Sequence, residues 1–299
     1  MKLKAWFSAL RLRTLPLAVS CVITGAGIAW QQDMLNWEIT SLALCTTIFL
    51  QILSNLANDF GDGVKGTDND ARIGPARALQ SGAISQSEMK LGIYVSALIS
   101  FTSGLWLLLA SLQFNWTFFI MLCIGLLSIG AAVKYTIGKS AFGYKGLGDL
   151  FVFLFFGPVG VLGTSFLQIG SFDWMHLLPA ASIGLLCTSV LNLNNMRDHK
   201  NDKNSNKNTM VVYMGYRNAK HYHAALTILP MLLFGTYVQI TANSLSWTYF
   251  SIPFFVVLLV LIRIYRIQNE KLMDGYLKIL TLTTFFTSVI FILSLVFTF

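Results

Sequence analysis

The chain has 299 residues, of which 55% are hydrophobic and only 11% are charged. An average soluble protein carries about 25% charged residues, so this composition excludes an ordinary soluble globular protein. The formal net charge of +8 fits either a nucleic-acid partner or an anionic membrane face, and the positions of the charges decide between the two.

Nine apolar runs follow one another along the chain. A hydrocarbon core about 30 Å thick needs about 20 apolar helical residues for each crossing. Strands are not needed, because a helix satisfies its own backbone hydrogen bonds in lipid. We therefore predict an all-α polytopic membrane protein that forms one domain over residues 1–299. The predicted helices lie at about 14–30, 39–57, 91–110, 117–137, 147–169, 176–195, 224–242, 248–267 and 277–297.

The basic residues fall on one side of these helices. With residue 1 in the cytoplasm, Lys and Arg are absent from the external connections 31–38, 111–116, 170–175 and 243–247. This positive-inside pattern predicts a protein of the cell (inner) membrane with a cytoplasmic N-terminus. A nucleic-acid-binding protein would instead mix basic and aromatic residues on a soluble face, so the bilayer is the expected partner and nucleic acid is not.

Two cytoplasmic segments are rich in Asp and Asn. The first Asp-rich loop, 55–82, follows the second helix, and the second Asp-rich loop, 192–209, follows the sixth. Corresponding aspartates in the two segments are 139 or 140 positions apart. This offset indicates two pseudo-repeats of four helices followed by a ninth helix.

Within each segment, two aspartates share one face of a helix. Asp59 and Asp62 are three residues apart, and Asp198 and Asp202 are four apart, which are the spacings that bring helical side chains together. Because two carboxylates this close repel each other, a cation is expected between them. Carboxylate and Asn oxygens favour Mg²⁺, which usually takes one or two carboxylates together with substrate phosphates. A merely solvated polar loop is the alternative for either segment alone.

Three spaced motifs occur in order along the chain. The pattern Asn-x-x-Asn-Asp-x-x-Asp-x-x-x-Gly-x-Asp-x-x-x-Arg lies at Asn55, Asn58, Asp59, Asp62, Gly66, Asp68 and Arg72. The element Tyr-x-x-x-Lys lies at Tyr135 and Lys139, and the pattern Asn-x-x-x-Asp-x-x-x-Asp lies at Asn194, Asp198 and Asp202. These motifs resemble the UbiA superfamily of intramembrane aromatic prenyltransferases. They most resemble its menaquinone branch, the 1,4-dihydroxy-2-naphthoate polyprenyltransferases.

The resemblance implies a UbiA-like bundle and a prenyl-transfer reaction. A polyprenyl diphosphate would donate its prenyl group to 1,4-dihydroxy-2-naphthoate with loss of diphosphate and CO₂, giving demethylmenaquinone. Mg²⁺ is the implied cofactor, and its implied ligands are Asp59, Asp62, Asp198 and Asp202, with Asp68 as a further catalytic residue. The implied diphosphate-binding residues are Arg72, Lys139, Arg77, Tyr135, Asn58 and Asn194.

The remaining sequence features bear on the substrates and on rival functions. Gly66 stands where the more general first motif of the superfamily has an acid, and the menaquinone branch shares this glycine and places an acid two residues later, here at Asp68. The resemblance therefore favours naphthoate over 4-hydroxybenzoate as the acceptor, and an enzyme for 4-hydroxybenzoate or homogentisate is the alternative. The run 151–160 is a candidate wall for an apolar substrate cavity. Lys200, Lys203 and Lys207 are interpreted as a face for anionic lipid, with closure of one of them over the substrate as the alternative. A secondary transporter is the alternative outside enzymes, but it would place its acids near the membrane midplane. Neither the oligomeric state nor the prenyl chain length follows from these motifs.

Overall fold

The computed structural model describes residues 2–69, 73–74, 77–242 and 248–296. Over these residues the chain is helical, and its one isolated bridge pairs Lys145 with Asn208. Nine helical spans within this part of the chain are long and apolar enough to cross a membrane. The prediction of an all-α integral membrane protein is therefore confirmed.

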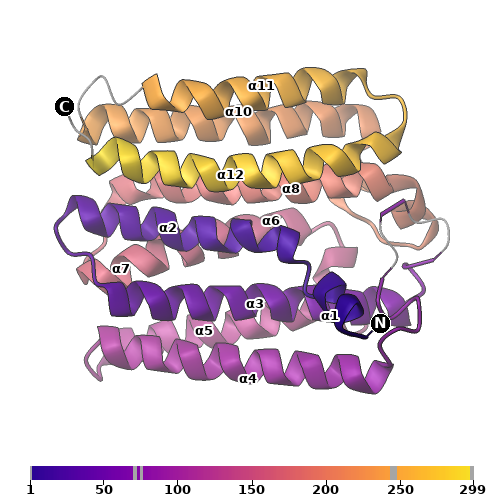
Figure 1. The fold of residues 1–299 in the computed structure, drawn as a ribbon, viewed down its shortest axis with the longest axis horizontal. Helices are drawn as coiled ribbons and strands as arrows, with labels where there is room; N and C mark the ends of the chain where they lie inside the picture. Colours follow the sequence, from indigo (N-terminus) through magenta and orange to yellow (C-terminus); the bar gives the residue numbers. More distant parts are fainter. Residues whose placement is uncertain (1, 70–72, 75–76, 243–247, 297–299) are drawn as a thin grey trace.

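The helices run side by side along the long axis of the molecule (Figure 1). The elements, in chain order, are α1 (Lys2–Ala9), α2 (Leu15–Gln31), α3 (Trp37–Val64), α4 (Gln86–Ser111), α5 (Trp116–Lys134), α6 (Gly148–Leu154), η3 (Phe155–Leu162), α7 (Gly163–Ile169), α8 (Leu177–Asn204), α9 (Met210–Met214), α10 (Tyr216–Thr241), α11 (Ser251–Arg266) and α12 (Met273–Val296).

Two groups of helices flank a central pair of spans. α3, α4 and α5 pack together on one side, and α8, α10, α11 and α12 pack together on the other. Between them lie α2 and the span built from α6, η3 and α7 (Figure 1). The N-terminus and the C-terminus lie at opposite ends of the bundle, as an odd number of crossings requires.

Several long helices begin at polar residues that cap their free backbone N–H groups. The Asn36 side chain accepts hydrogen bonds from the backbone of Glu38 and Ile39 at the start of α3. Asn115 caps α5 in the same way, and Ser85 forms a reciprocal capping box with Glu88 at the start of α4. These caps satisfy N–H groups that have no partner inside a helix.

The helices α3 and α8 extend further than hydropathy predicted. They continue to Val64 and Asn204 instead of ending near 57 and 195, so both Asp-rich segments expected as loops begin as the last turns of helices. Hydropathy detects only the part of a helix that crosses hydrocarbon, whereas backbone hydrogen bonding carries the helix on into polar surroundings.

The fifth span is interrupted where one continuous helix was expected. The segment η3 is π-helical and contains Pro158, which has no backbone N–H and therefore cannot complete the regular helical ladder. Gly157 of η3 and Gly184 of α8 permit close contact, because a Cβ on Gly157 would lie 2.6 Å from the Ala180 carbonyl oxygen. The broken span is thereby held tightly against α8.

Candidate active site

A cavity of about 750 Å³ lies inside the bundle, with walls from α2, α3, α5, η3 and α8. Its lining includes Arg11, which follows α1, together with the charged side chains Asp62, Asp202 and Lys207. Further along the helices its lining is apolar and extends to Leu107 and Phe172. A charged pocket thus continues into a long apolar chamber.

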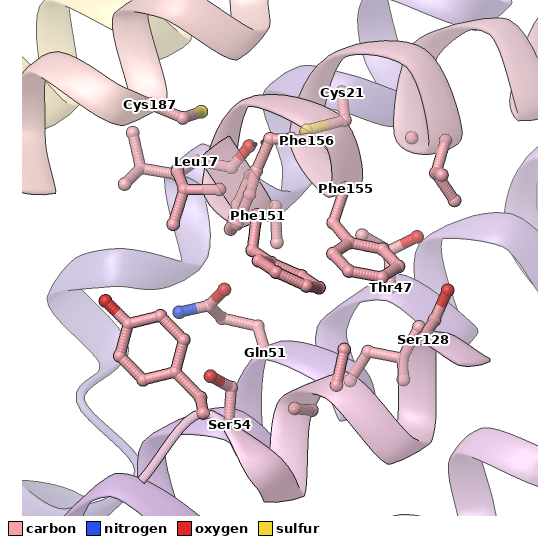
Figure 2. A pocket seen from close by; sticks show the side chains of 18 of the residues that line it. Leu17, Cys21, Thr47, Gln51, Ser54, Ser128, Phe151, Phe155, Phe156 and Cys187 are labelled. Carbon is pink, nitrogen blue, oxygen red and sulfur yellow. Dashed lines mark hydrogen bonds between the residues drawn. The ribbon is translucent and has the colours of Figure 1, made fainter. Parts of the chain in front are cut away.

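Aromatic side chains of the interrupted span form part of the chamber wall. Figure 2 shows Phe151 and Phe155 extending into the cavity, with Gln51 and Ser54 of α3 nearby. The two rings stack with their centroids 6.0 Å apart, and Phe156 also lines the space. The expectation that the run 151–160 borders a cavity is therefore confirmed.

Asp62 lies at the end of α3 and faces the charged pocket. Tyr144 donates a hydrogen bond to its Oδ1 at 2.7 Å, and Lys207 Nζ lies 3.3 and 3.1 Å from its two carboxylate oxygens. The backbone N–H of Asn208 donates to the Tyr144 carbonyl at 3.2 Å. This backbone contact brings two distant loops together and so delivers both partners to Asp62.

Asp59 lies one turn earlier on α3 and is only 1% exposed. Its carboxylate pairs with Arg11 and with Arg77 Nη1, the latter at 3.3 Å. Arg11 lies at the bend between α1 and α2 and has a positive φ of 48°. Arg77 Nε also lies 3.7 Å from Asp68 Oδ2. Arg11, Arg77 and Asp68 line the cavity, so the first motif is neutralised by cations that border the same space.

The second motif lies on the last turns of α8. Asn194, Asp198 and Asp202 all line the cavity. Arg197 donates hydrogen bonds to both oxygens of Asp198, at 3.0 and 2.6 Å, and to Asn194 Oδ1 at 2.8 Å. The two motifs thus meet across one cavity, although they come from opposite halves of the bundle.

Tyr135 follows α5 and lines the same cavity. Burial raises the pKa of its hydroxyl, and the nearby carboxylates of Asp149, Asp62 and Asp202 raise this pKa further. The group therefore stays protonated and can donate a hydrogen bond. Asn58 also borders the cavity and accepts a hydrogen bond from the Thr136 hydroxyl at 3.2 Å.

One of the expected diphosphate-binding residues lies away from the cavity, and another falls outside the part of the chain that the structure describes. Lys139 is exposed and does not line the cavity. Arg72 lies outside the described residues. The cations that do border the charged pocket include Arg11, Arg77 and Lys207.

Lys207 occupies a different environment from the lipid face expected for it. Lys200 and Lys203 are exposed, whereas the Lys207 side chain is only 14% exposed. Burial alone would lower its pKa, but the carboxylates of Asp62 and Asp202 outweigh burial and raise the pKa. Lys207 therefore remains a cation inside the site.

Sequence reasoning also missed Arg11, Tyr144 and Arg197. Arg11 belongs to the basic N-terminal segment, which was interpreted only as a topology signal. Tyr144 lies nine residues after Tyr135 and belongs to none of the three motifs, so no spacing in the sequence singled it out. Arg197 adjoins Asp198 in the chain, and neighbouring positions on a helix normally point about 100° apart.

The donor atoms at the charged pocket suit magnesium. Among the described residues, no three His, Cys, Asp or Glu side chains gather into a complete metal-binding group. Magnesium typically uses one or two carboxylates and takes its other oxygens from phosphates and water. The carboxylates of Asp62, Asp198 and Asp202, with the amides of Asn58 and Asn194, provide only hard oxygen ligands and therefore fit Mg²⁺ shared with a diphosphate.

Known proteins resemble this chain in both sequence and fold. Residues 18–296 match the UbiA prenyltransferase family. A 1,4-dihydroxy-2-naphthoate octaprenyltransferase of Escherichia coli is 42% identical over 247 residues, covering 82% of this chain and 80% of the relative.

Two solved structures share the fold. A UbiA homologue from Aeropyrum pernix has a TM-score of 0.65 at 16% identity, over 91% of this chain and 98% of that one. A UbiA homologue from Archaeoglobus fulgidus, bound to DMAPP and Mg²⁺, has a TM-score of 0.60 at 15% identity, over 93% of this chain and 98% of that one.

Proposed function

The chain belongs to the UbiA prenyltransferase family, and we propose that it transfers a polyprenyl group from polyprenyl diphosphate to 1,4-dihydroxy-2-naphthoate. The reaction releases diphosphate and CO₂ and forms demethylmenaquinone. One observation carries this proposal: the two Asp-rich motifs and several buried cations border one end of a cavity whose remaining length is apolar. A donor with a charged head and a long isoprenoid tail has this same distribution of polarity.

The diphosphate head binds at the charged pocket. Asp62, Asp198 and Asp202 would hold magnesium there, with Asn58 and Asn194 in support. Asp59, expected as a fourth ligand, does not line the cavity and instead holds Arg11 and Arg77 beside it. Magnesium, when bound, neutralises the diphosphate and favours its departure. Breaking the allylic C–O bond transfers negative charge to the leaving diphosphate, and Lys207, Arg77 and Arg11 are already placed to stabilise that charge.

The apolar chamber protects the allylic cation that remains. Phe151, Phe155 and Phe156 exclude water from its surroundings, and aromatic faces attract a cation electrostatically. Two residues of the chamber wall, Ile120 and Leu126 on α5, are 58% and 49% exposed. A tail longer than the chamber can leave the protein towards lipid at this wall.

The acceptor assignment rests on the relatives and on the first motif. The curated relatives from Escherichia coli and Haemophilus influenzae are named for 1,4-dihydroxy-2-naphthoate, and Asp68 borders the cavity two residues after Gly66. Prenyltransferases for 4-hydroxybenzoate or homogentisate are the nearest alternatives. We further propose that the charged pocket faces the cytoplasm of the cell, because the basic residues cluster at that end of the helices.

An acceptor screen tests the proposal. Purified protein in lipid nanodiscs is given Mg²⁺, farnesyl diphosphate and one candidate acceptor at a time, and products are identified by mass spectrometry. We expect a prenylated product from 1,4-dihydroxy-2-naphthoate alone, with equal release of diphosphate and CO₂, and no product when EDTA removes the magnesium. Turnover of 4-hydroxybenzoate in place of the naphthoate would overturn the acceptor assignment, and undiminished turnover in EDTA would overturn the role of the metal.

A further inference from the structure

Arg197 is a fully buried cation directly behind the second motif. Its side chain is 0% exposed, and its guanidinium contacts three side chains. Nε and Nη2 donate to the two oxygens of Asp198, Nη2 also donates to Asn194 Oδ1, and Nη1 donates to Asp274 Oδ1 at 2.6 Å. One rigid group therefore determines the orientation of two side chains that face the cavity.

This arrangement is not a consequence of helix geometry. Residues 197 and 198 are neighbours on α8, and side chains one position apart diverge by about 100°. Arg197 has to turn towards its neighbour, and Asp274 at the start of α12 provides the anion that holds it in that position. A buried guanidinium needs such a partner, because an uncompensated buried charge is costly.

We propose that Arg197 is a positioning residue that orients Asn194 and Asp198 towards the magnesium–diphosphate complex, and that Asp274 of α12 keeps Arg197 in place. The inference rests on the proposed function, in which Asn194 and Asp198 serve that complex. It gives the ninth span a part in the active site, since α12 contributes the carboxylate on which the orientation of the second motif depends. Partners behind metal-binding side chains typically change metal affinity by about 10- to 100-fold when they are replaced.

The structure provides a matched control. Lys200 of α8 pairs with Glu270 at 2.8 Å, just before α12, and so it joins the same two parts of the chain as Arg197 and Asp274. The Lys200 side chain is 71% exposed and borders no part of the cavity. Glu270→Gln therefore removes a second, more exposed ion pair between α8 and the region of α12 without disturbing Asn194 or Asp198.

The test measures metal binding directly. Full-length protein in detergent is titrated with Mn²⁺ in the presence of inorganic diphosphate, and free Mn²⁺ is followed by electron paramagnetic resonance. We expect Asp274→Asn and Arg197→Lys each to weaken Mn²⁺ binding by about tenfold or more, and Glu270→Gln to leave it unchanged. Lysine preserves the charge of Arg197 but cannot hold two side chains with a planar fork.

A second measurement separates positioning from general damage to the fold. In the prenyl-transfer assay, we expect Asp274→Asn to need about tenfold more Mg²⁺ for half-maximal rate, while its rate at saturating Mg²⁺ approaches that of the unaltered protein. Unchanged Mn²⁺ binding in both variants overturns the inference, as does an equal loss in Glu270→Gln. If the unaltered protein fails to bind Mn²⁺ with diphosphate, the proposed function itself is overturned.

Discussion

Lys207 donates hydrogen bonds to both carboxylate oxygens of Asp62, at 3.3 and 3.1 Å, although the two residues are 145 positions apart. The pair joins the segment after α8 to the end of α3, and Lys207 lines the cavity beside Asp202. A cation held between the two motifs is suitably placed to contact the diphosphate that both motifs bind in the proposed reaction.

The first prediction therefore concerns Lys207. Hydrogen bonds to charged groups contribute about 1.5–3 kcal/mol, so Lys207→Met is expected to lower kcat/KM for the prenyl diphosphate by at least about tenfold. Lys203→Met is the matched control, since Lys203 is an exposed lysine in the same segment and its loss is expected to leave the rate unchanged. Steady-state kinetics with a fixed acceptor concentration measure both effects. Equal rates for the two variants would contradict the assigned role of Lys207.

The second prediction concerns the carboxylates. Asp62→Asn and Asp202→Asn should each lower prenyl transfer by about 100-fold or more, because an amide provides no negative charge for magnesium. Expression and elution from a sizing column should stay normal. Glu38→Gln, at the exposed opposite end of α3, should retain full activity. The assignment of the metal site fails if both aspartate variants turn over at near-normal rates.

The third prediction concerns the packing of Tyr135. A Cβ on Gly148 would lie 2.6 Å from the Tyr135 hydroxyl oxygen, which is closer than two such atoms can approach. Gly148→Ala should displace this hydroxyl from the cavity and lower kcat by about tenfold, a typical effect of misplacing one donor. Gly130→Ala on α5 is the control, because nothing lies within 4 Å of its added Cβ. If both variants keep full activity, the position of Tyr135 is unimportant for turnover.

The fourth prediction concerns orientation in the membrane. In a background that lacks Cys123, a cysteine at Phe172 should react with an impermeant maleimide added to intact cells, and a cysteine at Asn204 should react only after lysis. Both positions are exposed in the structure; Phe172 precedes the start of α8 by five residues, and Asn204 is the last residue of α8. Gel-shift or mass analysis of the labelled protein reads out the result. The reverse labelling pattern would place the charged pocket outside the cell.

Much of the fold was predictable from local chemistry. Apolar runs located all nine described spans, for example the predicted 117–137 against the observed Trp116–Lys134. The ends of α3 and α8 were not predicted, because their last turns are polar and hydropathy does not register them. The interruption at η3 was also missed, since an apolar run that contains Pro158 has the hydropathy of a continuous span.

The candidate site was also predictable from the sequence only in part. Spacing along the chain was enough to single out Asp62, Asp198 and Asp202, because residues three or four apart share a helix face whatever surrounds the helix. Their partners were not predictable by this route. Lys207 reaches Asp62 from a segment that is held in place by backbone hydrogen bonds from Asn208 to Tyr144 and from Lys207 to Asp202.

The sequence by itself determined the class of protein, the number of membrane spans among the described residues and the identity of the carboxylates in the two Asp-rich motifs. Each of these follows from composition or from the periodicity of a single helix, and none of them depends on residues far apart in the chain. Only the tertiary structure decided which cation meets which carboxylate and which residues enclose the apolar chamber. Lys207 and Lys203 look alike in the sequence, but one is buried against Asp62 and the other faces outward. Such pairings depend on how helices far apart in the chain pack against one another, and short-range patterns carry no record of that packing.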